Sequence, residues 1–154
     1  MILRRATLDD MELLIKLRLD YFAAENDILS AETLDTLQKS LRSYFKAHLP
    51  AETFIAIIGE IDGRAVSTAY LAIREVPANP SFMNGRAATI YNVLTYPEYR
   101  GRGLATRVLQ KIIDEAERLK VPCISLSATA EGLPIYERLG FRPSRYTAMN
   151  LSLL

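Results

Sequence analysis

The stretch that decides the fold is Arg100-Gly101-Arg102-Gly103-Leu104-Ala105-Thr106. It follows a β-rich segment at residues 87–96. It opens a segment, residues 103–120, in which apolar side chains recur about every 3.6 positions, the period of an α-helix. A further apolar segment at 121–127 reads as the next strand. The sequence therefore predicts a strand, a glycine turn, a helix and a second strand joined by a right-handed parallel crossover.

The glycine turn has the chemistry of an anion site. The first turn of a helix exposes amide groups without an internal partner, and the helix dipole adds partial positive charge there. Gly101 and Gly103 permit backbone conformations closed to other residues and leave room for a phosphate, while Arg100 and Arg102 add cationic donors. The turn lacks the Gly-Lys-Ser/Thr of a Walker loop, and Thr106 stands where a dinucleotide fingerprint would need a third glycine. An ordinary tight turn with solvated arginines remains the alternative.

The remaining elements can be assigned outward from this unit. Upstream, the patterns predict a strand at 2–5, a helix from Thr7 to about Ala24, a helix capped by Ser30 and ended by Pro50, and strands at 53–60 and 64–76. Asp62-Gly63 joins these two strands as a hairpin turn. Residues 77–86 are expected to form a surface loop, which either walls a binding pocket or is an unstructured connector. Downstream, we expect a short helix at 133–139, stopped by Gly140, and a last strand at about 146–153.

The order β-α-α-β-β-β-α-β-α-β predicts one α/β domain over residues 1–154, with a mixed central sheet flanked by helices. The net charge of +1 gives no global field toward nucleic acid, and no aromatic residues alternate with the arginines. No apolar run is long enough to cross a membrane, and the N-terminus does not resemble a signal peptide.

Two single residues invite chemical interpretations that the sequence does not support. Cys123 is the only cysteine, so it cannot form an internal disulfide, and no Cys/His cluster has the spacing of a metal site. We expect it to be a small buried residue at a strand start and the protein to be cytoplasmic and metal-free. His48, the only histidine, is expected to have an ordinary place near a helix end.

Tyr136 lies in the predicted short helix. A phenol with an ordinary pKa of about 10 is a proton donor at neutral pH, so Tyr136 could protonate a departing thiolate. The alternative is a tyrosine that packs its ring and hydrogen-bonds its hydroxyl.

Together, the two segments resemble the GNAT superfamily of acyl-CoA-dependent N-acyltransferases. Arg100, Gly103 and Ala105 match the defined positions of its Arg/Gln-x-x-Gly-x-Gly/Ala signature. Tyr136-Glu137-Arg138-Leu139-Gly140-Phe141 is similar to its Tyr-Glu-Lys-x-Gly-Phe segment. The order of elements also fits from end to end, so the resemblance covers the whole chain.

The resemblance implies a role for each matched position. The cosubstrate would be acetyl-CoA or another acyl-CoA, bound in the gap between the strand ending at Thr95 and the strand ending near Ser127. Tyr136 would protonate the CoA thiolate. Main-chain groups of Val93, Leu94 and Thr95 would pair with the pantetheine arm. The pyrophosphate would be held by amides of Arg100, Gly101, Arg102, Gly103, Leu104, Ala105 and Thr106.

The sequence departs from the family pattern at two places. Thr129 occupies the position of a cofactor-binding asparagine, and residues 89–92 offer no glutamate as a general base. Glu25, Glu75 and Glu98 are the remaining candidates for the base. The expected function is N-acetyl transfer to a primary amine of a small molecule or peptide. The competing function is a non-catalytic acyl-CoA-binding or protein-interaction module on the same fold.

The acceptor is not identified by any motif. Tyr91 and Asn92 lie near the expected pocket and could position a polar amine. Glu25, Asn26 and Asp27 form an acidic spot that suits a cationic substrate. A homodimer is compatible with the sequence, which does not specify the oligomeric state.

Overall fold

A computed structural model describes residues 1–153. Its elements are β1 (Ile2–Arg5), η1 (Leu8–Asp10), α1 (Met11–Ala24), α2 (Ala31–His48), β2 (Phe54–Ile61), β3 (Arg64–Glu75), β4 (Arg86–Thr95), η2 (Pro97–Tyr99), α3 (Leu104–Arg118), β5 (Ile124–Ser125) and α4 (Leu133–Arg138). The sheet order is β1-β2-β3-β4-β5, with antiparallel neighbours except for the parallel pair β4–β5. The α/β class and the mixed, helix-flanked sheet predicted from the sequence are confirmed.

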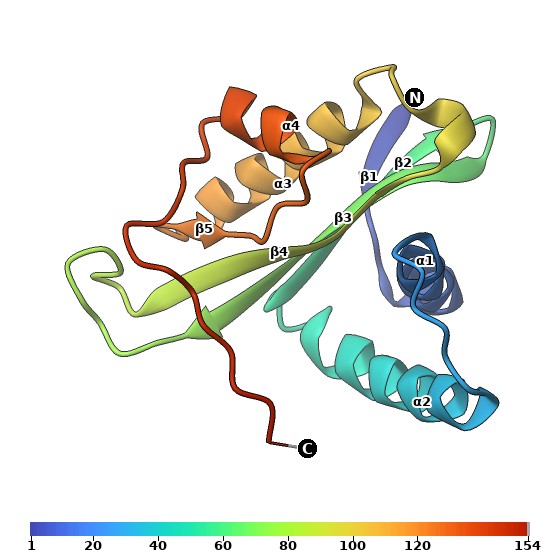
Figure 1. The fold of residues 1–154 in the computed structure, drawn as a ribbon, viewed down its shortest axis with the longest axis horizontal. Coiled ribbons are helices and arrows are strands. Elements are labelled where there is room, and N and C mark those ends of the chain that lie inside the picture. The colour runs from blue at the N-terminus through green and yellow to red at the C-terminus, as the bar shows by residue number, and fades with distance from the viewer. Residues whose placement is uncertain (154) are drawn as a thin grey trace.

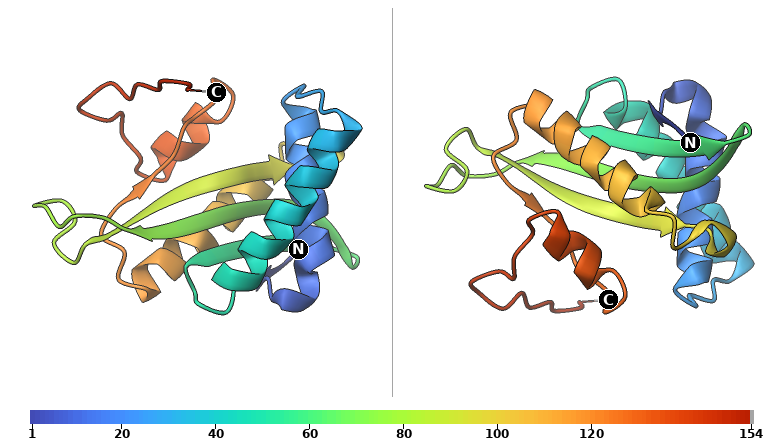
Figure 2. Two further views of the ribbon diagram at one scale, coloured as in Figure 1. Left: turned by 90° about the horizontal axis from the view of Figure 1, so that it is seen from below. Right: turned by 90° about the horizontal axis from the view of Figure 1, so that it is seen from above.

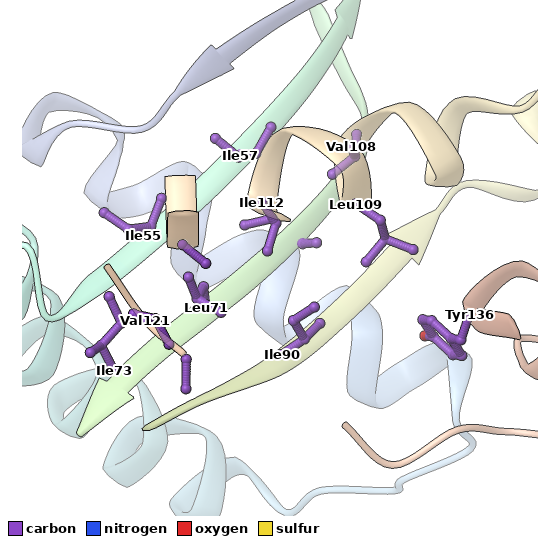
Figure 3. Packing of buried hydrophobic residues seen from close by; sticks show 13 residues of the cluster. Ile55, Ile57, Leu71, Ile73, Ile90, Val108, Leu109, Ile112, Val121 and Tyr136 are labelled. Atoms are coloured by element: carbon purple, nitrogen blue, oxygen red, sulfur yellow. The ribbon is translucent and has the colours of Figure 1, made fainter. Parts of the chain in front are cut away.

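Helices cover both faces of the sheet (Figure 1). On one face, α3 buries Val108, Leu109 and Ile112 against alternate residues of the central strands, in the core drawn in Figure 3. On the other face, α1 and α2 enclose a second core that includes Leu14 and Phe45. Because β2 is covered on both sides, its successive side chains enter the two cores in turn, which explains why it reads as a continuous apolar run.

The residues predicted to cap helices or to form turns have these roles in the structure. The side chain of Ser30 accepts a hydrogen bond from the Thr33 amide and caps α2. Asp62 and Gly63 both have positive φ, as a two-residue hairpin turn of the I′ type requires. Gly140, at φ 96°, follows the end of α4.

Three sequence predictions are wrong. The strand expected at 121–127 is reduced to Ile124–Ser125, because β5 pairs with β4 only at Ala88 and Thr89. The strand expected at 146–153 is absent, because the segment after α4 stands clear of the sheet and finds no strand to pair with (Figure 2). Cys123 is exposed, because it precedes the short β5 and its side chain is not covered by the core.

A β-bulge divides β4 into two halves. Ile90 points into the core under α3, whereas Leu94 points into the core under α1, although both have even numbers. The register with β3 shifts between these two positions, and Asn92 has φ 55°. Asparagine tolerates this left-handed conformation better than most residues. The extra residue therefore re-aims every side chain that follows it in β4.

Asn92 also attaches the bulge to α1. Its side chain is buried, donates to the carbonyl oxygen of Leu17 at 3.3 Å and accepts from Nη1 of Arg18 at 3.3 Å. Nearby, the Tyr70 hydroxyl on β3 donates to the Leu14 carbonyl at 2.7 Å. Helix α1 is thus fixed to the sheet by polar contacts as well as by its apolar face.

Replacing Asn92 by alanine should lower the free energy of unfolding by about 1–3 kcal/mol, since it leaves the buried contacts of the amide unmade and keeps a side chain at positive φ. Asn92→Gly should cost less, because glycine relieves the backbone strain while losing the same contacts. Urea unfolding measures both, with Asn150→Ala in the exposed C-terminal segment as the control. Equal costs for the two Asn92 variants would show that the backbone conformation contributes nothing.

Candidate active site

The unpaired edge of β4 borders the main cavity of the protein. In the part of the chain that the structure describes, β4 has no strand beside it on the β5 side beyond Thr89. The main chain of Val93, Leu94 and Thr95 therefore runs along an open edge. The cavity beside it has a volume of about 570 Å³. Its walls come from α1, the end of β4, the start of α3 and the segment leading into α4.

The start of α3 presents unpartnered amides to this cavity. Gly103 is the N-cap and has φ 71°, and no side chain caps the helix. The first helical bond runs from the Arg107 amide to the Gly103 carbonyl, so the amides of Leu104, Ala105 and Thr106 have no backbone partner among residues 1–153. No acidic residue lies in this first turn. These features together leave a site with partial positive charge that suits a phosphate.

The glycines of the turn act through their backbone conformation. Gly101 and Gly103 both have positive φ, and a Cβ built on either would meet no atom within 4 Å. The space beside them is therefore open, and the reason for glycine is the left-handed backbone. The surrounding arginines hold the turn: Nε of Arg100 donates to the Thr95 carbonyl at 3.0 Å, and Nη2 of Arg102 donates to the Glu98 carbonyl at 3.1 Å.

Tyr136 enters the same cavity from α4, across from β4 (Figure 3). Its ring is buried and meets Phe141 edge-on, with 6.0 Å between ring centres. Its hydroxyl has no hydrogen-bond partner among the described residues. The hydroxyl oxygen is also not fully buried, so it is accessible from the cavity that Tyr136 lines. Burial raises the pKa of the phenol above its ordinary value, which keeps it protonated at neutral pH.

A smaller cavity of about 240 Å³ continues from the first on the β5 side of the bulge. Tyr136, Tyr21 and Glu25 border both cavities, so the two cavities adjoin at these residues. Tyr91 and Asn92 line the smaller cavity, as do Arg18 and Thr129. Because Tyr91 and Asn92 are the residues at which an acceptor is expected from the sequence, this smaller cavity is called the acceptor cavity below.

The structure brings most of the sequence-predicted residues together. The main cavity is lined by Glu25, Val93, Leu94, Thr95, Arg100, Gly101, Gly103, Ala105, Thr106, Thr129 and Tyr136. Leu104 instead turns into the core, and Arg102 lies against the ring of Tyr99. The amide of Asn92, expected to position an amine, is already engaged by α1.

The three candidate bases lie in different places. Glu25 is at the junction of the two cavities. Glu75 is exposed at the end of β3, opposite Arg86, and Glu98 lies beside Tyr99 in a separate surface hollow. Asn26 and Asp27, the other members of the expected acidic spot, border neither the main nor the acceptor cavity.

Other expected features lie away from these cavities. The loop at 77–86 borders neither of them; instead, Nδ2 of Asn84 donates to the Lys120 carbonyl, at 2.7 Å, beyond the end of α3. His48 has structural contacts, with 2.7 Å between its Nδ1 and Oγ1 of Thr53 and its ring stacked on Tyr44. No group of three or more potential metal ligands occurs within residues 1–153. Among the described helices, none has the length and apolar character needed to cross a bilayer.

Sequence reasoning missed two residues of α1 at this site. Arg18 and Tyr21 share one helix face with Glu25, through spacings of three and four residues. That spacing was readable from the sequence, but no local signal indicated that this face meets β4.

The glycine signature and the tyrosine that share one cavity are features of a known family. A model of the GNAT acetyltransferase domain matches residues 3–144. The chain belongs to the GNAT acetyltransferase family. A predicted acetyltransferase from Clostridium acetobutylicum, crystallised with acetyl-CoA, superposes on this GNAT domain with a TM-score of 0.85 and 27% identity, covering 97% of this chain and 95% of that one.

Curated relatives match over shorter segments. Glucosamine 6-phosphate N-acetyltransferase of Trypanosoma brucei brucei is 33% identical over 82 residues, 52% of each chain. A ribosomal protein bS18-alanine N-acetyltransferase of Escherichia coli is 35% identical over 57 residues, 35% of this chain and 38% of that protein. An uncharacterized N-acetyltransferase, ycf52, of Pyropia yezoensis is 33% identical over 58 residues, and the match spans only 33% of its length.

Gly132 is the glycine that makes room for Tyr136. A Cβ at position 132 would lie 2.9 Å from Cε2 of the tyrosine ring, closer than two non-bonded carbon atoms can pack. Gly132→Ala should therefore displace the ring and lower both activity and stability. In a Tyr136→Ala background the same change should cost little, giving a coupling free energy of about 0.5–3 kcal/mol in a double-mutant cycle followed by thermal unfolding. Additive costs would show that the two residues do not press on each other.

Proposed function

We propose that this protein transfers an acetyl group from acetyl-CoA to a primary amine of a small molecule or peptide. The observation that carries the proposal is that the unpartnered amides at the start of α3, the open edge of β4 and the Tyr136 hydroxyl all face one cavity. These are an anion site, a main-chain site for an extended amide-bearing arm and a proton donor, which are the three groups that bound acetyl-CoA needs for transfer. The similarity to a structure crystallised with acetyl-CoA supports this choice of cosubstrate.

In the proposed reaction, the neutral amine attacks the thioester carbonyl carbon, and a new C–N bond forms. The negative charge on the carbonyl oxygen is stabilised by a β4 amide, that of Leu94 or Thr95. The C–S bond then breaks, and Tyr136 donates its proton to the leaving thiolate. The proton lost by the amine passes through water to Glu25, because this is the one candidate base at the junction of the two cavities.

The acceptor class follows from the relatives only in broad terms. Their names specify glucosamine 6-phosphate in one case and an alanine of ribosomal protein bS18 in another. Both names describe acetyl transfer to nitrogen, which agrees with the proposed reaction.

The direct test is to incubate the protein with acetyl-CoA and a panel of amines and to follow thiol release. Turnover with at least one amine is expected. Binding of acetyl-CoA, seen as a rise in melting temperature, without turnover across a broad panel would favour the competing acyl-CoA-binding module.

Tyr136→Phe removes the proposed proton donor while keeping the ring that packs on Phe141. We expect the dissociation constant for acetyl-CoA to stay within about twofold and kcat to fall by about 10²-fold or more. Since the pKa of Tyr136 is raised, the wild-type rate should stay on its plateau through neutral pH and decline only above the ordinary tyrosine pKa of about 10. An unchanged kcat would remove Tyr136 from the acid role.

Gly103→Ala tests the anion site at the start of α3. Alanine at φ 71° costs about 1–2 kcal/mol in the left-handed region, so the turn should distort and acetyl-CoA should bind about tenfold more weakly. Gly63→Ala, which places the same strain in the β2–β3 hairpin, is the matched control and should leave acetyl-CoA affinity unchanged. Equal affinity in the Gly103 variant would indicate that the pyrophosphate is held elsewhere.

A further inference from the structure

Arg18 is the positively charged side chain in the lining of the acceptor cavity, and the proposed reaction gives it no role. It projects from α1 between the acceptor cavity and a second cavity, of about 310 Å³, under α2. Tyr91 also borders both spaces. The second cavity is mainly aromatic and aliphatic, lined by Leu41, Tyr44, Phe45, Phe54, Tyr70 and Ala72.

Within residues 1–153, no carboxylate neutralises Arg18. Its guanidinium donates to the side-chain oxygen of Asn92 at 3.3 Å and lies over the ring of Phe22, 4.4 Å from the ring centre. Among the described residues, no acidic oxygen lies within ion-pair distance of it. Arg4, by contrast, pairs with Asp10 and Glu60, and Arg5 pairs with Glu52, whereas the half-buried Arg86 donates to the Leu119 carbonyl.

The surroundings make this unpaired charge unfavourable. Burial lowers the pKa of Arg18, because the guanidinium is partly withdrawn from water. A partly buried cation without a counter-ion costs free energy that a bound anion would offset. Since its one hydrogen bond to Asn92 uses a single N–H of the five in the guanidinium, donors remain for a ligand.

The charges on this face of α1 are separated. Glu25 lies seven residues after Arg18, on the same side of the helix and about 10 Å along its axis. Asp20, the acid nearest in sequence, bonds instead with Lys16 and the Tyr96 hydroxyl. The acceptor cavity is therefore acidic at the end beside Tyr136 and basic at the end beside Arg18.

We propose that Arg18 is a specificity-determining residue and that the acceptor is an amine carrying an anionic group, a carboxylate or a phosphate, which this guanidinium binds. The inference rests on the proposed acetyl transfer. The planar guanidinium matches the paired oxygens of either group. With the anion at Arg18, the amine of the acceptor extends toward Glu25 and Tyr136, and the aromatic cavity receives an apolar part of the molecule.

Matched acceptor pairs test the inference. Phenylalanine and phenethylamine differ by a carboxylate, whereas glucosamine 6-phosphate and glucosamine differ by a phosphate. For wild type we expect kcat/KM to be about 10- to 100-fold higher for the charged member of at least one pair, and the pair that shows the preference identifies the anion. Arg18→Gln should abolish that preference by raising KM for the charged acceptor, while KM for acetyl-CoA stays unchanged.

Two further variants separate recognition from folding. Arg18→Lys keeps the charge without the planar fork and should retain part of the preference. Arg64→Gln, at an exposed position of the β2–β3 hairpin, removes a positive charge elsewhere and should retain all of it. Melting temperatures identify any variant that fails to fold. If Arg18→Gln does not fold, the inference is tested by the wild-type preference for charged acceptors and by its reduction in Arg18→Lys.

The outcomes distinguish this inference from the proposed function. Transfer to the neutral and charged members at equal rates overturns the role of Arg18 and leaves acetyl transfer intact. Retention of the preference in a folded Arg18→Gln also overturns it. Absence of transfer to every amine contradicts both.

Discussion

The site depends on the contact between Asn92 and helix α1. This one side chain accepts from Arg18 and donates to the carbonyl of Leu17, while its own backbone takes the left-handed conformation that bends β4. A bulge left to itself disrupts a ladder of hydrogen bonds. Here the buried amide compensates by fixing α1 across the bend, so that strand and helix hold each other in place.

Two features of β4 shape the cavity beside it. After Asn92, Val93 faces α3 and Leu94 faces α1. Since Ile90 faces α3, regular alternation along the strand would have placed Val93 toward α1 and Leu94 toward α3. In addition, β5 pairs with β4 only at Ala88 and Thr89, so the end of β4 has an open edge beside the cavity. The main-chain groups proposed to bind the pantetheine arm and the carbonyl oxygen are available for this reason.

The same contact organises the acceptor side. Tyr91 and Asn92 are consecutive, yet both are directed toward α1, as the two residues of a bulge are. Arg18 is held by Asn92 at one end of the acceptor cavity, and Glu25 lies two helical turns later. The donor site comes from the turn before α3, and the acceptor site comes from α1 and the bulge. Tyr136 on α4 stands where the two meet.

By itself, the sequence determined the features that depend on local backbone chemistry. Gly101 and Gly103 before an amphipathic helix, Asp62-Gly63 between two strands and Ser30 before α2 each specify their structure through conformational preference or capping. Tyr136, four residues before Gly140, could be related to the turn only through the family resemblance.

What tertiary structure alone decided depends on partners distant in sequence. Whether residues 121–127 and 146–153 form strands depends on a neighbouring edge, and that edge is lost where β4 and β5 part. Asn92 gave no sign that it would form a bulge, since its conformation is stabilised by carbonyl and guanidinium groups more than 70 residues away. Arg18 carried no motif, because an arginine becomes a candidate ligand-binding group only when folding buries it without a carboxylate beside it.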